Sequence, residues 1–545
     1  MNFTITDTAE RWAAFWKDVT LVMPEIWLVI AMCAVILVPF LRRDNVRLPM
    51  YAALGGLALA LVAVCRNMQS DVVGDQSLIQ SVFHGMLVVD PFSYFFKFLL
   101  ILFTALVISQ WWLLTRERPA AVDTPDFFCL LLGAVFGMSL MASANNLLMI
   151  LIATESASLP SFALAGFAKH TRRGTEGSLK YVIFGAAASA VSIYGMSLIY
   201  GATGTLSLDG IAASAQAAGG MSPLMAVGVL AMFAGFAFKL SAVPLHFWCP
   251  DVFQGAPIPV TTFLSVVSKG AALVMVTRVL HAFGVARAPS GNEIDGLFTG
   301  LAVGVGILGG VTATWGNLVA FHQNNFKRLL AYSSIAHAGY MIMGAAAMIY
   351  SQKAADDVAG ALLFYLLVYI FMNLGAFTIV GIIAQRTGSE DVRDYAGLIK
   401  RSPAMAGLLI LFLLSLFGMP GLGGFLGKIY LMKAMGQIGV GGFVLIAALL
   451  INTLISLYFY MRPVYYMVFV ADDKNRPSFP LGAGFAILVC CAIALVWTGL
   501  DLGASKLTSG YAALRDPTRP VPVQPKPAPV TAEAEAAAIP VAAKR

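Results

Sequence analysis

Long apolar stretches recur along the whole chain and constrain its fold more than any other feature. A helix needs about 20 mostly apolar residues to cross the hydrocarbon core of a bilayer. Only 12% of the residues are charged, against roughly 25% in an average soluble domain. The sequence therefore predicts an all-α polytopic membrane protein with about 14 transmembrane helices. These are 20–40, 48–65, 91–115, 126–143, 146–168, 179–201, 224–247, 258–284, 297–320, 329–350, 358–384, 404–435, 442–470 and 482–503.

Lysine and arginine residues are distributed unevenly between the predicted connections. Connections after odd-numbered stretches hold sixteen of them, whereas those after even-numbered stretches hold three, Arg66, Arg287 and Lys353. Basic connections tend to remain in the cytoplasm. We therefore expect both chain termini on the opposite, periplasmic side. The net charge of +7 arises from these scattered residues, so we expect no nucleic-acid partner.

Two five-helix segments, 126–284 and 297–470, share a plan. The fourth stretch of each contains a helix break and a lysine: Lys239 is followed by a proline, and Lys428 is preceded by a proline and four glycines. Because five is odd, consecutive five-helix units must run in opposite orientations. Inverted repeats with matching broken helices are typical of transporters, and the breaks mark the functional site.

Three further segments complete the predicted organisation. An N-terminal three-helix segment occupies 1–125, and a last transmembrane helix occupies 482–503. The Pro- and Ala-rich segment 516–545 lacks large apolar residues, and we expect it to be a disordered tail.

Four ionisable residues lie deep in predicted spans: Glu155, Lys239, Lys269 and Lys428. Each such residue costs roughly 2.5–3.5 kcal/mol on insertion scales and is a functional candidate by default. Lys180 lies nearer a helix end and could instead extend to the surface. Glu155 could form a structural ion pair, and each deep lysine could make a hydrogen bond that only packs helices. Three lysines near mid-depth nevertheless favour a shared role.

A lysine removed from water can exchange protons, because desolvation disfavours its charged form and a nearby carboxylate favours it. We expect Glu155 and Lys180, on consecutive helices, to form a controlling pair. Lys239 would be the central proton carrier, Lys269 a relay and Lys428 the next station. Breaks beside Lys239 and Lys428 would expose backbone carbonyls and admit water.

Two histidines are weaker candidates for proton relay, because imidazole titrates near neutral pH. His337 lies inside a predicted span, and His246 lies at the end of the stretch that contains Lys239. A neutral histidine that only packs and hydrogen-bonds is an alternative for both. Asp251, near the cytoplasmic surface, could serve only to cap the following turn.

Motifs for other chemistries occur in the wrong context. GVGILGG at 304–310 matches GxGxxG but lies inside a predicted span with no strand before it. GLGGFLGK at 421–428 lacks the glycine spacing of a P-loop and its Ser or Thr. The six cysteines show no metal or cluster spacing. We expect no cofactor, metal or redox centre in this chain.

Several segments resemble the antiporter-like subunits of respiratory complex I, the proton-pumping NADH:quinone oxidoreductase. They are KLSAVPLHFWCPDVFQGAPIPVTTFLSVVSKGAAL, LLAYSSIAHAGYMIMG, LKYVIFGAAASAVSIYGMSLIYGATGTLSL and GMPGLGGFLGKIYLMKA, within a resemblance that covers about residues 20–500. Three paralogous subunits and the Mrp-type cation/proton antiporters share this plan. The chain most resembles the N type, because the M type usually carries a glutamate at Lys428 and the L type has a long lateral helix.

The resemblance implies a proton-translocating subunit in the membrane arm of the complex, in the bacterial inner membrane. The pump residues of this family match Glu155, Lys180, Lys239, Lys269 and Lys428. Electron transfer through FMN, iron–sulfur clusters and quinone would occur in partner subunits. The expected neighbours are the M subunit, small K- and J-type subunits and lipids. The alternatives are an Mrp-type antiporter subunit and a scaffold that does not transport.

Overall fold

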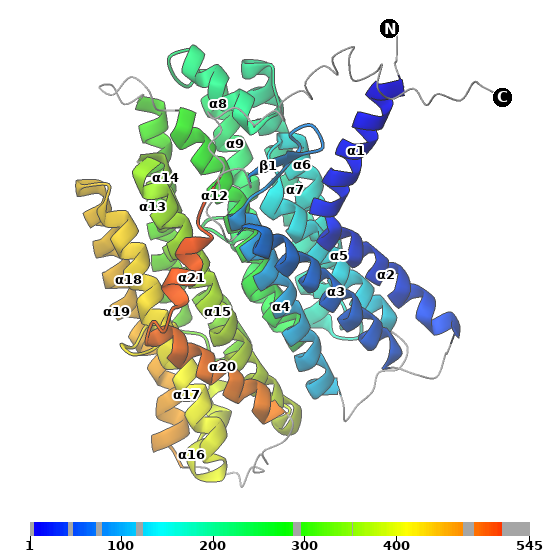
Figure 1. Cartoon of the computed structure of the whole chain (residues 1–545). Coiled ribbons are helices and arrows are strands. Elements are labelled where there is room, and N and C mark those ends of the chain that lie inside the picture. Colours follow the sequence, from blue (N-terminus) through cyan, green and yellow to red (C-terminus); the bar gives the residue numbers. More distant parts are fainter. Residues whose placement is uncertain are drawn as a thin grey trace, which may run out of the picture.

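The computed structural model describes residues 5–41, 47–71, 79–115, 124–286, 296–350, 352–471 and 484–514. Helices make up most of these residues and pack side by side in one bundle (Figure 1). The segment 516–545, predicted to be a disordered tail, lies outside the described residues.

The helices before residue 287 include those that hold four of the predicted pump residues. They are α1 (Ile5–Leu21), α2 (Met23–Leu41), α3 (Leu48–Asp71), α4 (Pro91–Thr115), α5 (Thr124–Ser143), α6 (Leu147–Ala165), α7 (Arg172–Thr203), α8 (Leu208–Ala217), α9 (Pro223–Leu240), α10 (Trp248–Gly255), α11 (Ile258–Phe263) and α12 (Lys269–Ala286). A π-helical turn, Leu264–Ser268, joins α11 to α12.

The second half repeats the alternation of long and short helices. It comprises α13 (Gly296–Ala320), α14 (Phe326–Tyr350), α15 (Gln352–Thr387), a 3₁₀ turn (Val392–Tyr395), α16 (Leu398–Arg401), α17 (Pro403–Phe417), α18 (Gly423–Gly436), α19 (Val440–Phe469), α20 (Gly484–Gly499) and α21 (Ala504–Gly510).

Eleven of the described helices are long and apolar enough to cross a membrane, or up to twelve if α20 and α21 form one span. The predicted count of 14 is therefore not confirmed, although each predicted stretch contains helix. α14 is long enough but less apolar, and α17 is too short. α20 ends at a bend of 80° before α21.

Two local features were not predicted. α1 forms an additional helix before the first span, and Trp12, Phe15 and Trp16 on it are exposed. A hairpin of two three-residue strands, β1 (Gln80–Val82) and β2 (Leu87–Val89), precedes α4. The pattern of apolar stretches carries no information on these short elements, because they do not span the membrane.

Both predicted helix breaks are present. α9 starts with Ser222 as its N-cap and ends at Ser241, whose φ of 55° is left-handed. α17 ends at Gly418, whose φ of 95° only glycine adopts readily. A left-handed residue stops the helical hydrogen-bond ladder, so carbonyls at the end of each helix become available to other donors.

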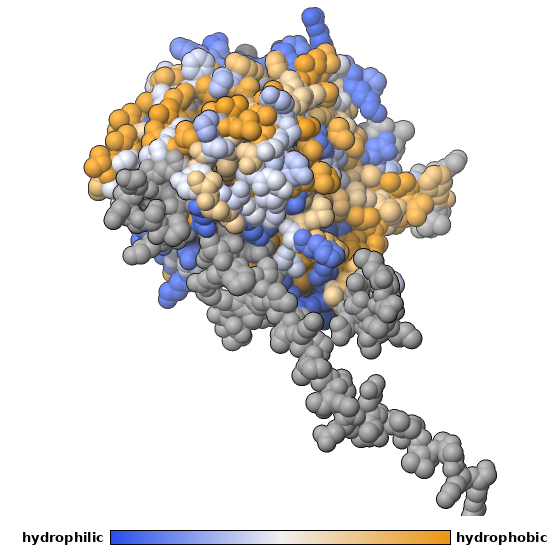
Figure 2. Space-filling model, turned by 90° about the horizontal axis from the view of Figure 1, so that it is seen from above, coloured by the Kyte–Doolittle hydropathy of each residue, from blue (hydrophilic) through white to orange (hydrophobic). Residues whose placement is uncertain are grey.

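The centre of the bundle is formed by helices that other helices enclose. The span Ile258–Val285 is almost entirely buried, and so is most of α15. Seen from above, apolar side chains follow much of the outline of the molecule (Figure 2). Exposed examples are Leu179 and Phe184 on α7, Ile307 on α13, and Phe443 and Leu454 on α19. An apolar outer surface around a more polar interior is the arrangement that lipid requires.

Candidate functional site

Lys269 lies at the centre of the bundle, where the π-turn meets α12. Its ammonium donates to Ser334 Oγ on α14 at 2.6 Å and lies 3.5 Å from Cys249 Sγ on α10. The side chain is only 1% exposed. π-turns inside helices occur frequently at functional sites because they redirect side chains. The π-turn, which the sequence did not indicate, directly precedes Lys269 and therefore sets the direction of its side chain.

Lys428 on α18 uses the carbonyl that the second helix break releases. Its Nζ donates to Phe417 O, at the end of α17, at 2.6 Å and lies 5.1 Å from the centre of the Tyr340 ring on α14. Gly418 follows, and a Cβ there would lie 3.2 Å from Lys428 Nζ. The break therefore releases a carbonyl, as the sequence analysis expected, and also leaves space for the ammonium group.

Lys239 occupies the last turn of α9 and donates to Ser158 Oγ on α6. Glu155 lies one turn earlier on α6, and its Oε1 accepts from Ser189 Oγ on α7 at 2.6 Å. The carbonyl of Phe238, released by the break, accepts from the indole of Trp248 at 3.0 Å. At this break the free carbonyl therefore accepts from Trp248 and not from the lysine. Lys239 instead contacts the Ser158 hydroxyl, one turn from Glu155.

Lys180 does not make the expected contact with Glu155. Within the described residues, it pairs with Asp251 on α10 at 2.6 Å and with Glu176 one turn earlier on α7 at 2.7 Å. Glu155 meets α7 at Ser189, nine positions further on, which is about 13 Å at 1.5 Å per residue. The sequence places both residues on consecutive helices but does not specify their heights along those helices.

Asp251 links three helices and does more than cap a turn. Its carboxylate accepts from Lys180 on α7 and from Arg328 on α14, each at 2.6 Å. Burial alone would raise the pKa of Asp251, but hydrogen bonds and attraction from these two cations hold that pKa below its usual value. Asp251 therefore remains ionised and joins α7, α10 and α14 near one end of the bundle.

His337 on α14 is hydrogen-bonded at both ring nitrogens. Nδ1 lies 2.6 Å from Tyr365 Oη on α15, and Nε2 lies 3.2 Å from Tyr460 Oη on α19. Tyr460 also hydrogen-bonds Ser333 on α14. A hydroxyl can donate or accept, so the imidazole is bound in a chain of groups that can pass a proton in either direction.

His246 lies outside that chain. Its Nε2 accepts from the indole of Trp315 on α13 at 2.9 Å, so a neutral ring carries its proton on Nδ1. The side chain is buried in the connection between α9 and α10. The other predicted residues lie on helices that contact one another, and His246 contacts α13, which packs against α14.

α14 connects the second half of the site. Ser334 contacts Lys269, His337 follows three positions later, and Tyr340, another three positions on, lies against Lys428. Residues spaced three or four apart share one face of a helix. The face of α14 therefore lies between the two lysines that the sequence placed 159 positions apart.

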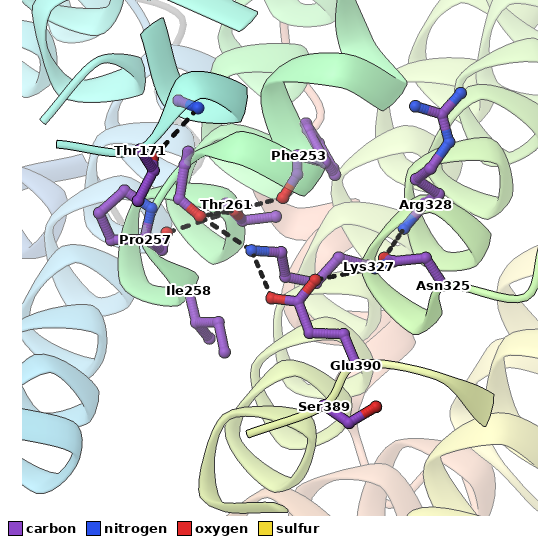
Figure 3. A network of polar contacts seen from close by, with 12 residues as sticks. Thr171, Phe253, Pro257, Ile258, Thr261, Asn325, Lys327, Arg328, Ser389 and Glu390 are labelled. Carbon is purple, nitrogen blue, oxygen red and sulfur yellow. Dashed lines mark hydrogen bonds and ion pairs between the residues drawn. The ribbon is translucent and has the colours of Figure 1, made fainter. Parts of the chain in front are cut away.

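Three ion pairs, two of them buried and the third with a buried lysine, were missed by the sequence analysis. Lys97 on α4 pairs with Glu25 on α2 at 2.7 Å, and Arg278 on α12 pairs with Asp90 at 2.8 Å. Lys327, at the start of α14, pairs at 2.9 Å with Glu390 in the connection after α15 (Figure 3). The six residues lie near the ends of apolar runs, where charged residues are common. Apart from the presence of a charge, the sequence therefore gave no sign that they pair.

Across the described residues, no group of three His, Cys, Asp or Glu side chains is arranged to hold a metal ion. The polar groups that surround Glu155, Lys239, Lys269 and Lys428 are amines, hydroxyls, an imidazole and a carboxylate. Such groups can bind, hold and pass protons.

Comparison with known proteins identifies the family. The transmembrane model of the NADH:quinone oxidoreductase/Mrp antiporter family matches residues 144–456, more than half of the chain. NADH-quinone oxidoreductase subunit N of an Anaeromyxobacter species is 40% identical over 472 residues, which cover 82% of this chain and 87% of that one. The chain belongs to the family of NADH-quinone oxidoreductase N subunits.

A second relative has the same name, and solved structures share the fold. Subunit N of a Geobacillus species is 37% identical and covers 83% of this chain and 90% of its own. A chain of respiratory complex I from Thermus thermophilus with bound aureothin is 31% identical, with a TM-score of 0.70, over 88% of this chain and 98% of that one. A chain of the Mrp complex from a Dietzia species has a TM-score of 0.74 over 92% of this chain and 98% of that one, but its 20% identity shows only a shared fold.

Proposed function

We propose that this N subunit translocates protons within the membrane arm of an NADH:quinone oxidoreductase. The observation that carries the proposal is the row of polar groups on α14. Ser334, His337 and Tyr340 lie between the amines of Lys269 and Lys428, both of which are almost fully buried. Buried amines next to hydroxyl and imidazole groups can bind a proton, pass it on and be restored.

The first half of the path is Glu155 and Lys239. Ser158 binds the Lys239 ammonium one turn from Glu155, so the carboxylate favours the charged form of the lysine. Movement of Glu155 or Lys239 would change that balance and release a proton towards Lys269. Lys180 pairs with Asp251 and not with Glu155. Its charge would therefore change the electrostatic potential near the start of α7 without direct contact with Glu155.

The proposal includes the finer topology. Two inverted five-helix repeats, 126–284 and 297–470, would place the broken helices α9 and α17–α18 in equivalent positions. The two breaks support this repeat because each contains a left-handed residue next to the site. Ser241 lies two positions after Lys239, and Gly418 follows Phe417, whose carbonyl accepts from Lys428. With α14, α17–α18 and α20–α21 counted as spans, the chain crosses the bacterial inner membrane fourteen times, with both termini in the periplasm.

Redox chemistry belongs to other subunits in this proposal. The chain itself would carry no redox centre, while FMN, iron–sulfur clusters and quinone would be held by its partners. The M-type subunit, the small K- and J-type subunits and lipids would surround its apolar outer surface. Electron transfer in the partners would drive proton movement here through conformational or electrostatic changes.

The decisive experiment measures protons moved per electron in vesicles that contain the whole complex. Lys239→Met and Glu155→Gln should lower the ratio or stop coupled turnover, while the complexes still assemble. Normal pumping by both assembled variants would refute the proposal and favour a scaffold.

An Mrp-type antiporter subunit is the alternative. The similarity to the Dietzia Mrp complex concerns the fold alone, whereas the Anaeromyxobacter N subunit is 40% identical to this chain. Co-purification with FMN and iron–sulfur subunits is expected under the first proposal. Sodium-dependent exchange by a complex without them would support the second.

A further inference from the structure

A polar cavity of about 770 Å³ opens at the end of the bundle that the Lys and Arg distribution assigns to the cytoplasm. Its walls come from the start of α7, the connection between α10 and α11, the connection before α14 and the connection after α15. Thr171, Asn325, Ser389 and Glu390 are among its polar residues. A cavity with such walls is suited to hold water.

Lys327 is the buried cation that lines this cavity. Its side chain is only 5% exposed, and its Nζ donates to Ala256 O at 3.0 Å and pairs with Glu390 Oε1 at 2.9 Å (Figure 3). Glu390 is 26% exposed, and its Oε2 accepts from Asn325 Nδ2 at 2.8 Å. The carboxylate thus lies between the cavity and a buried ammonium, while Arg173 and Asp391 add one charge of each sign to the walls.

Lys327 lies on the same helix as the acceptor of Lys269. Ser334, whose Oγ binds the Lys269 ammonium, is seven positions after Lys327, about 10 Å further along the same face of α14. Beside this interval, the Thr261 hydroxyl donates to the carbonyl of Phe253 on α10 and to that of Pro257, which also accepts the first backbone bond of α11 from Thr261 N at 2.9 Å. One hydroxyl and two carbonyls therefore lie beside the region between the cavity and the central amine.

We propose that this cavity is the entrance for protons and that Glu390 is the side chain that takes them up for Lys269. A proton from water in the cavity binds a carboxylate oxygen of Glu390, which becomes neutral and loosens its contact with Lys327. Lys327 keeps its own proton. The proton then leaves Glu390, crosses the interval through bridging water and the Ser334 hydroxyl, and binds the neutral amine of Lys269. Glu390 is again a carboxylate and re-forms the ion pair. This inference rests on the proposed function.

The test uses the whole complex in vesicles and compares Glu390→Gln, Glu390→Asp and the control Asp391→Asn. The control carboxylate lines the same cavity but caps the 3₁₀ turn by accepting from Arg393 N at 2.8 Å. We expect Glu390→Gln to assemble and to slow coupled proton translocation at least about tenfold, a conservative figure for a lost proton-transfer group. Added formate should restore several-fold of that rate, which a purely structural defect would not allow. Asp391→Asn should leave the rate unchanged.

Two outcomes would overturn the inference: full pumping by Glu390→Gln, or a loss that formate does not relieve. If Glu390→Gln does not assemble, Glu390→Asp decides, because a shortened carboxylate should pump several-fold more slowly and an unchanged rate would reject the entrance. Lys239→Met separates the two proposals. If Lys239→Met stops pumping and Glu390→Gln does not, only the entrance is rejected, whereas normal pumping by both variants rejects the proposed function itself.

Discussion

The ion pair between Glu25 and Lys97 allows a quantitative prediction. The two charges lie 2.7 Å apart, and their side chains are 5% and 1% exposed. At an effective dielectric constant of about 20, such charges attract each other by roughly 6 kcal/mol. Desolvation offsets part of this attraction, and removal of one partner from a buried pair typically costs about 3–5 kcal/mol. We therefore expect Lys97→Met to lower the free energy of unfolding by about 3–5 kcal/mol.

Removal of both charges should cost much less. In Lys97→Met the Glu25 carboxylate keeps, among the described residues, only the hydroxyl of Ser139, 2.6 Å away, and its other oxygen has no partner there. Glu25→Gln removes the charge that this arrangement cannot satisfy. The double variant should recover most of the loss, because replacement of a whole buried pair is often nearly neutral.

The assay is a double-mutant cycle on the free energy of unfolding in mixed lipid–detergent micelles. Lys433→Met, which removes an exposed lysine on α18, is the control and should change the free energy by less than about 0.5 kcal/mol. Additive losses, with the double variant as unstable as the sum of the single variants, would refute the reasoning. So would a loss below about 1 kcal/mol for Lys97→Met alone, because it would mean that Glu25 is satisfied by other means.

Three further predictions concern the site. Ser334→Ala removes the acceptor of Lys269 and should slow coupled proton translocation in vesicles without loss of assembly; an unchanged rate would contradict the relay along α14. The low pKa of Asp251 means that its stabilising effect is complete above the ordinary pKa of about 4 and is lost as the pH falls through the lowered value. Asp251→Asn should therefore lower the thermal midpoint at pH 7 and leave it less sensitive to pH below about 4 than that of the wild type; equal midpoints at pH 7 would show that the ion pairs contribute nothing. Gly418→Ala should destabilise the chain by about 1–2 kcal/mol because of its left-handed conformation, and should displace Lys428; an unchanged thermal midpoint together with normal pumping would contradict it.

Much of the helical framework could be predicted from the sequence, because lipid imposes a local rule on every span. An apolar stretch and a basic connection can each be recognised without knowledge of the partner helices. The breaks near Lys239 and Lys428 were equally visible, since proline and glycine act on their own backbone. The π-turn at 264–268 was not, because an extra residue in a helical turn leaves no mark on composition.

Contacts between helices were beyond the reach of the sequence. The partner of Lys180 depends on how α7 is rotated and shifted against α6 and α10. Glu155 contacts α7 at Ser189, nine positions after Lys180, so Lys180 reaches Asp251 instead. Glu25 and Lys97 each stand within two turns of a helix end, where a charge usually reaches water. Only the packing of α2 against its neighbours encloses them together.

α14 shows why the apolarity rule is weakest for a helix that other helices enclose. Every residue from 329 to 349 on this helix is buried, so other helices and not lipid surround it. A helix in that position can carry Ser334 and His337, because lysine and tyrosine side chains from neighbouring helices satisfy them. These polar groups lower its hydropathy below that of the lipid-facing spans. In a bundle of this kind, a long helix that is too polar to count as a membrane span is therefore the first place to look for buried polar groups that hydrogen-bond across the bundle.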